Sequence, residues 1–115
     1  MDNFMKTLKE YGADVESAMI RLMDDSELYE DCTRAFVHDS AFAELGKAIA
    51  EKDYENAFNS AHTLKGVAAN LSLAPMVETI SVMVEDLRSG VHDNLEMQYS
   101  ALIKQLEKLK EILSL

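Results

Sequence analysis

The sequence has little of what most fold classes need at their turns. Its 115 residues include one proline and four glycines, which is too few for the frequent turns of a β-sandwich or a barrel. Val, Ile and Thr are never concentrated in alternating runs, so no strands are predicted. We therefore expect an all-α protein, and the length fits one domain over residues 1–115.

Cysteine and long apolar runs are scarce as well. The single Cys32 excludes an internal disulfide and a cysteine-based zinc site. No run of 18 apolar residues exists, and residues 1–6 show neither a long apolar segment nor a small-residue cleavage site. We expect no membrane span and no secretory signal, which favours a cytoplasmic location.

Positive charge is in short supply. Lys and Arg number 11 against 21 Asp and Glu, which gives a formal net charge of −10. Phosphate backbones and anionic lipids attract basic surfaces, so neither a nucleic acid nor a membrane is expected as a partner. Hydrophobic residues make up 48% of the chain, enough for a folded core.

Helix stop and start signals divide the chain. Gly12 ends a first helix that begins near Asn3, and Asp14 caps a second one. Further helices are predicted over about residues 26–38, 40–51, 53–71, 75–89 and from 93 or 94 onward. Pro75 suits the first position of its helix.

Apolar residues recur at steps of three and four in the last three helices, as in helices packed against near-antiparallel neighbours. Short loops join them. We expect an up-down antiparallel four-helix bundle, with short additional N-terminal helices covering one end. The predicted seams are Ala57, Ala61, Leu64, Ala68 and Leu71; Met76, Ile80, Met83 and Leu87; and Leu95, Tyr99, Leu102, Leu106, Leu109 and Leu113.

One histidine does not fit this core. At about 100° per residue, His62 lies about 140° from the centre of its helix's seam, so it should face solvent or a groove beside the neighbouring helix. Phe58, Asn59, Lys65 and Gly66 share that side. Gly66 and Gly46 each stand inside a predicted helix, where alanine would be better by about 1 kcal/mol. Gly66 is either a tolerated glycine or a means to keep the face beside His62 open.

The surroundings of His62 also lack carboxylates. The 22 residues from Asn56 to Val77 contain no Asp or Glu, and Lys65 is the only formal charge among them. A site that handles an anionic group explains this, because carboxylates nearby would repel it. A neutral imidazole is a good nucleophile toward phosphorus near pH 7, and an adjacent lysine helps to neutralise phosphoryl oxygens. No ATP-binding motif and no carboxylates for Mg²⁺ accompany it, so a partner would supply the metal and an acceptor Asp.

The segment Ala61-His62-Thr63-Leu64-Lys65-Gly66-Val67-Ala68-Ala69-Asn70-Leu71 resembles the signature of histidine-containing phosphotransfer (HPt) domains. The resemblance extends to residues 53–58 and 73–75, and the helix order fits nearly the whole chain. It implies a four-helix bundle that takes a phosphoryl group from, and returns it to, the Asp of response-regulator receiver domains in two-component phosphorelays. A hybrid sensor kinase is a further partner of such a carrier, which is not itself a kinase.

By position, the resemblance makes His62 the phosphoacceptor, Lys65 its electrostatic support and Gly66 the opening for the receiver domain. Phe58, Asn59 and Ala69 are expected to take part in docking. No cofactor is expected on this chain, Mg²⁺ is expected on the receiver domain, and we expect a monomer. Ala69 and Ser72 stand where relatives often have Gly, and Ala74 where a capping Thr or Ser is common. No Gln, which some relatives place near the histidine, occurs between Pro75 and Gly90.

Two other classes of function stay open. A helical-bundle interaction module without phosphotransfer would use exposed Phe58 and methionines alone. An enzyme with His62 as general base is disfavoured, because no carboxylate lies one turn away to orient the ring. His38 and His92 have no Lys-Gly neighbours at helical spacing and are interpreted as surface or helix-end residues.

Overall fold

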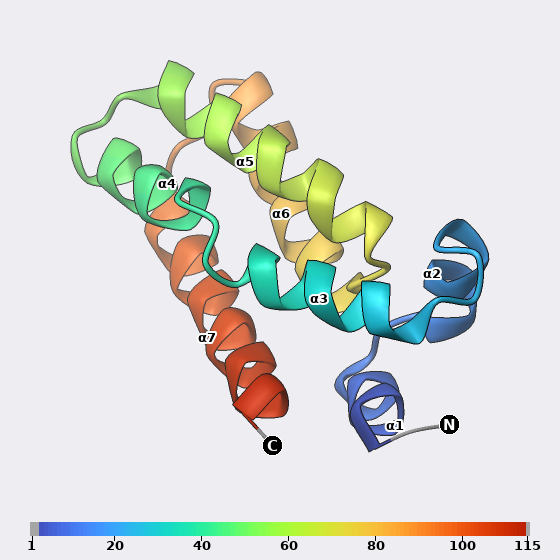
Figure 1. Ribbon diagram of the computed structural model, residues 1–115. Helices are drawn as coiled ribbons and strands as arrows, with labels where there is room; N and C mark the ends of the chain where they lie inside the picture. The colour runs from blue at the N-terminus through green and yellow to red at the C-terminus, as the bar shows by residue number, and fades with distance from the viewer. Residues whose placement is uncertain (1–2, 115) are drawn as a thin grey trace.

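The computed structural model describes residues 3–114, and every regular element in that range is a helix, as the sequence predicts (Figure 1). None of these helices has both the length and the apolar character needed to span a bilayer. The helices are α1 (Asn3–Tyr11), α2 (Val15–Arg21), α3 (Ser26–Phe36), α4 (Ala41–Ala50), α5 (Tyr54–Asn70), α6 (Ala74–Arg88) and α7 (Leu95–Ser114).

Helices α4 to α7 form the expected up-down bundle. Helix α5 packs between α4 and α6, while α7 packs against both α6 and α4 and closes the bundle (Figure 1). Each helix runs opposite to the one before it, because the loops between them span only a few residues. The bundle elongates the molecule, which measures 43 × 24 × 20 Å along its principal axes.

The predicted seams form the core of this bundle. All their members are buried except Tyr99, which is half-buried and donates a hydrogen bond of 2.9 Å from its hydroxyl to the Phe42 carbonyl. Leu64, Ile80 and Leu102, one from each of three helices, are fully buried. Each such side chain contributes roughly 1.5–3 kcal/mol when it is removed from water.

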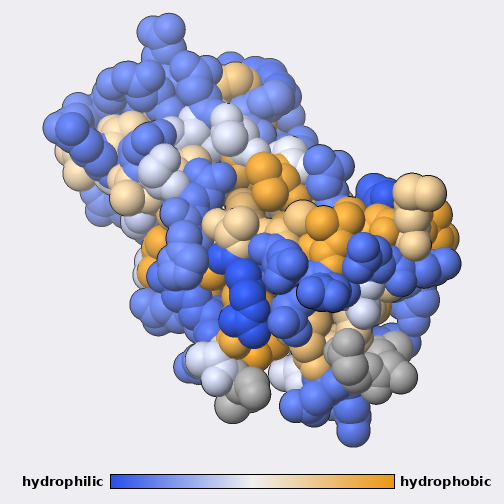
Figure 2. All heavy atoms as spheres, in the orientation of Figure 1, coloured by the Kyte–Doolittle hydropathy of each residue, from blue (hydrophilic) through white to orange (hydrophobic). Residues whose placement is uncertain are grey.

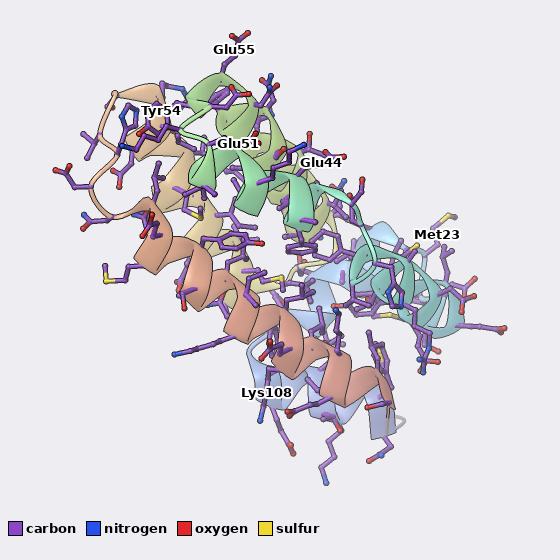
Figure 3. The ribbon with its side chains drawn as sticks, turned by 90° about the vertical axis from the view of Figure 1, so that its left-hand side faces the viewer. Met23, Glu44, Glu51, Tyr54, Glu55 and Lys108 are labelled. Carbon is purple, nitrogen blue, oxygen red and sulfur yellow. The ribbon has the colours of Figure 1, made fainter. Side chains whose placement is uncertain are left out.

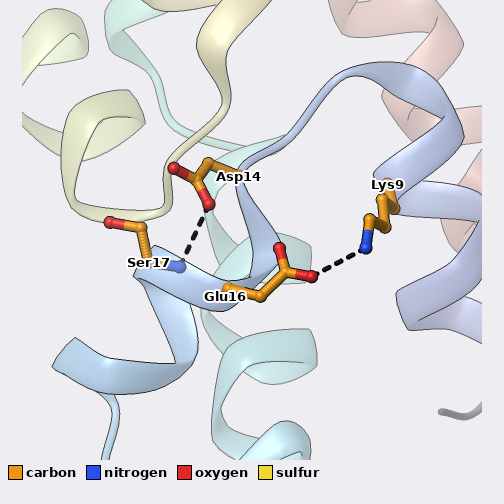
Figure 4. Close-up of polar contacts among 4 residues, drawn as sticks. All are labelled: Lys9, Asp14, Glu16 and Ser17. Carbon is orange, nitrogen blue, oxygen red and sulfur yellow. Dashed lines mark hydrogen bonds and ion pairs between the residues drawn. The ribbon is translucent and has the colours of Figure 1, made fainter.

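The N-terminal helices extend one end of the bundle, as predicted. Helix α1 packs against α7. Asp14 caps α2 by accepting a 3.1 Å hydrogen bond from the amide of Ser17, and Lys9 forms a 2.7 Å ion pair with Glu16 (Figure 4). Because both side chains of that pair are exposed to water, the pair adds little stability.

Helix α3 is fixed to the bundle through Tyr29. The ring is fully buried, and its hydroxyl donates a 2.7 Å hydrogen bond to the carbonyl of Leu71 at the end of α5. Burial raises the pKa of this hydroxyl to about 12, because the charged phenolate would lose its hydration. The N-terminal region therefore holds the end of the helix that carries His62.

Three details of the helix ends differ from the prediction. Helix α3 ends at Phe36, before His38, because residues 37–38 turn away into the loop. Ser40 precedes α4 but makes no capping bond, since its backbone is already helical (φ −61°, ψ −20°). The carboxylate of Asp39 accepts instead from the amide of Ala41 at 2.9 Å. Helix α6 begins at Ala74, one residue before Pro75.

The outer surface is unevenly polar. Figure 2 shows hydrophilic side chains over α4 and the start of α5, and hydrophobic side chains nearer α3 and α2. Exposed apolar residues cluster around the turn between α2 and α3, where Ile20 is 78% and Met23 is 89% exposed. Met23 extends away from the bundle at this end of the molecule (Figure 3).

Candidate functional site

Helix α5 places His62 near its middle because of its cap and its small seam residues. The carboxylate of Asp53 accepts a 3.3 Å hydrogen bond from the amide of Asn56 and so starts the helix. Ala57, Ala61 and Ala68 occupy most of the buried seam. Alanine at these positions stabilises a helix and lets α4 and α6 approach closely. The opposite side of α5 is therefore left at the surface.

The side chain of His62 is exposed, which confirms the expectation from its helical phase. Its ring stacks on the ring of Phe58 one turn earlier, with the centroids 5.8 Å apart and the planes inclined by 26°. Within residues 3–114, no hydrogen bond or ion pair engages either ring nitrogen. Both nitrogens are thus available to an incoming group.

Lys65 and Gly66 lie one turn beyond His62. Lys65 is half-buried, and its ammonium takes part in no ion pair or hydrogen bond among the residues that the structure describes. Gly66 is exposed, and a Cβ atom built there would meet nothing within 4 Å. An uncommitted positive charge and an open backbone surface therefore stand beside the imidazole.

The other predicted docking residues lie on the same side of α5. Asn59 and Ala69 are exposed, whereas Phe58 is half-buried against the core. The structure thus brings together all six residues singled out from the sequence, through the repeat of a single helix. All six lie close together because they belong to neighbouring turns of α5, without help from a distant part of the chain.

The two sides of α5 differ in charge. Its α4 side borders a groove whose lining includes the carboxylates of Glu44, Glu51 and Asp53. In Figure 3, Glu44 extends from α4 and Glu51 from the residue that follows it. His62 and Lys65 instead occupy the side that carries Phe58, which contacts α6 through Arg88. The carboxylates that line this groove therefore lie on the opposite side of α5 from the imidazole.

Helix α6 adds residues that the sequence reasoning missed. The guanidinium carbon of Arg88 lies 5.5 Å from the centroid of the Phe58 ring, a cation–π contact. Arg88 also forms an ion pair with Glu85 on its own helix. Helical phase in the sequence shows that the two share a face of α6. It gives no sign that this face turns toward His62.

Two of the positions that depart from the HPt pattern, Ser72 and Ala74, lie at the turn between α5 and α6. Ser72 has φ +54°, a left-handed conformation that favours glycine, and its hydroxyl accepts a 2.7 Å hydrogen bond from Arg21. Arg21 also donates to the carbonyl of Asn70 at 3.1 Å, so α2 supports the strained turn after α5. Before Ala74, the N-cap residue Leu73 makes no side-chain capping bond.

The other histidines are placed differently. His92 is half-buried and stacks on Tyr54 with 3.5 Å between ring centroids. His38 is exposed in the turn after α3. In residues 3–114, no group of three or more His, Cys, Asp and Glu side chains is placed to hold a metal ion.

The arrangement defines a class of protein: a small helical bundle that presents one imidazole, flanked by a lysine and a glycine, from a helix in its middle. A family model described as Hpt domain matches residues 1–112. The chain therefore belongs to the Hpt domain family, and so has a phosphotransfer role in two-component signalling. Members of the family are phosphocarrier modules rather than kinases, and they interact with response-regulator receiver domains. No significant match to a curated protein or to a solved structure was found.

Proposed function

We propose that the protein is a phosphorelay intermediate that carries the phosphoryl group on His62 and exchanges it with the Asp of receiver domains. The observation that carries this proposal is the state of the imidazole. It is exposed, its nitrogens have no partner in residues 3–114, and no carboxylate lies one helical turn from it on α5. An imidazole held in this way is a nucleophile rather than an oriented general base.

The reaction needs few groups from this chain. The lone pair of one ring nitrogen attacks the phosphorus of an aspartyl phosphate, and an N–P bond forms. The P–O bond to the aspartate breaks, and the carboxylate leaves with the bonding electrons. The other ring nitrogen keeps its proton. The same steps in reverse return the group to a second receiver domain.

Lys65 and Gly66 have complementary parts in this scheme. The ammonium of Lys65 stabilises the negative charge on the phosphoryl oxygens as a point charge. Gly66 lets the backbone of the receiver domain approach the imidazole, because nothing stands within 4 Å of the position of its missing Cβ. Phe58, Asn59 and Ala69 form the surrounding docking surface.

The partner supplies what this chain lacks. We propose that Mg²⁺ belongs to the receiver domain, where it neutralises charge on the phosphoryl group in transit. Hybrid sensor kinases are proposed as further partners, with a monomeric carrier that acts in the cytoplasm. The net charge of −10 disfavours binding to nucleic acid or to anionic membranes.

The test is transfer of radiolabelled phosphate from a phosphorylated receiver domain in the presence of Mg²⁺. We expect a label on the protein that is labile in acid and stable in alkali, as a phosphoramidate bond is. His62→Gln should keep the fold, because the side chain lies outside the core, and abolish the label. His38→Gln, which changes another exposed histidine, is the matched control and should label like the wild type.

Two results would contradict the proposal. A folded His62→Gln protein that still takes up label would place the phosphoacceptor elsewhere. The absence of label from every receiver domain tried would favour an interaction module without phosphotransfer. That alternative draws on the apolar cluster at Ile20 and Met23, which is exposed at the far end of the molecule.

A further inference from the structure

Three side chains from two helices contact one another at the candidate site. Arg88 of α6 lies over the ring of Phe58, and that ring stacks on His62. The Arg88 guanidinium carbon is 5.5 Å from the Phe58 centroid, and the Phe58 and His62 centroids are 5.8 Å apart. The Phe58 ring thus contacts both the imidazole and a second cation.

The cation is held there by a weak partner. Arg88 pairs with Glu85 three residues earlier, but the two side chains are 52% and 60% exposed. Ion pairs exposed to water contribute little net stability, because solvent competes for both charges. The guanidinium can therefore leave Glu85 at small cost when a stronger anion comes within reach.

A phosphoryl group on His62 is such an anion. It carries up to two negative charges and three acceptor oxygens, and it binds a guanidinium through charge-assisted hydrogen bonds. The side chain of Arg88 is long and half-exposed, so it can turn about the Phe58 ring toward His62. Glu85 would then be left without its partner.

We propose that Glu85 and Arg88 form a charge latch, in which Glu85 restrains Arg88 over Phe58 until phosphorylation of His62 draws the guanidinium to the phosphoryl oxygens. This inference rests on His62 as the phosphoacceptor. Arg88 then binds the phosphoryl group directly, and Glu85 sets how readily Arg88 reaches it. By helical phase, the charged side chains on this side of the two helices are Glu55 and Lys65 of α5 and Glu78, Glu85 and Arg88 of α6.

The experiment loads the protein chemically and reads the phosphoryl group itself. Phosphoramidate donates the group to the imidazole with release of ammonia, so no cognate partner is needed. The ³¹P resonance of the phosphohistidine is then followed against pH. A nearby cation disfavours protonation and lowers the midpoint, so Arg88→Gln should raise it by about half a pH unit. Glu85→Gln frees the arginine and should lower the midpoint.

Two controls separate this effect from a general one. Arg34 forms a comparable exposed ion pair with Glu30 on α3, so Arg34→Gln should leave the midpoint unchanged. Arg88→Lys keeps the positive charge, so its midpoint should lie much closer to the wild-type value than the midpoint of Arg88→Gln. Circular dichroism establishes that each variant is folded before it is titrated.

The outcomes distinguish this inference from the proposed function. If the wild type accepts phosphate at His62 but Arg88→Gln and Arg34→Gln titrate alike, the latch is wrong and the carrier function stands. If Glu85→Gln does not shift the midpoint in the direction opposite to Arg88→Gln, Glu85 does not restrain the arginine. If no phosphohistidine forms at His62 from phosphoramidate or from a receiver domain, the carrier function itself fails.

Discussion

Gly46 and Gly66 stand inside helices in two regions with opposite surroundings. A Cβ atom at Gly46 would lie 2.5 Å from the hydroxyl oxygen of Tyr99. Helices α4 and α7 can therefore pack in this way only because residue 46 has no side chain. At Gly66 a Cβ atom would meet nothing within 4 Å. Packing therefore explains the glycine at position 46, but no contact among residues 3–114 explains the glycine at position 66. The comparison suggests that the requirement at Gly66 comes from outside the molecule, as a docking partner would impose.

The largest effect is expected from filling the open region. Gly66→Gln should leave the helix intact and slow phosphotransfer from a receiver domain by about 100-fold, because a misplaced approach to the reacting atoms costs that order of rate. The rate of label transfer measures the slowing of phosphotransfer, and the circular dichroism spectrum shows whether the helix is intact. A wild-type transfer rate in this variant would remove the docking role of Gly66.

Filling the packed region should instead lower stability. Gly46→Ala forces Tyr99 to move, although its hydroxyl is bonded to the carbonyl of Phe42 at 2.9 Å. Overpacking costs about 1–3 kcal/mol, against which alanine regains about 1 kcal/mol of helix propensity. Urea denaturation should show a net loss of up to about 2 kcal/mol in the free energy of unfolding. An unchanged midpoint would mean that the ring moves freely.

The same small substitution has the opposite sign at the other glycine. Gly66→Ala should raise the free energy of unfolding by about 0.5–1 kcal/mol, because alanine is the better helix former and meets no neighbour. Urea denaturation beside Gly46→Ala measures the difference directly. A loss of stability at Gly66 would contradict the open surroundings on which the docking argument depends.

The smallest effect concerns pH. Burial raises the pKa of the Tyr99 hydroxyl above its ordinary value of 10.0, which favours the protonated form in the folded state. Its contribution to stability is full below pH 10 and is lost as the pH rises through the raised pKa. Tyr99→Phe should therefore lose less stability than the wild type on alkaline titration. Substitution at Gly66 should leave the slope of stability against pH unchanged. A changed slope in that variant would contradict the difference drawn between the packed surroundings of Gly46 and the open surroundings of Gly66.

Local sequence patterns predicted most of the candidate site. His62, Lys65 and Gly66 lie on consecutive turns of one helix, so their proximity follows from the 3.6-residue repeat alone. The exposure of His62 followed from the same repeat. Arg88 could not be found in this way, because it lies 26 positions along the chain and reaches the site only through the packing of α6 on α5.

The sequence by itself determined the helices, their buried seams and the side of α5 that faces water, since periodicity and capping act over a few residues. Only the tertiary structure decided which helix flanks each side of α5. Four helices with the same seams can turn to the left or to the right around the bundle, and the two arrangements exchange the places of α4 and α6 beside His62. Either arrangement buries the seams equally well. The folded chain puts Glu44 of α4 and the adjoining Glu51 on the side of α5 away from the imidazole, and it puts Arg88 of α6 on the same side as the imidazole.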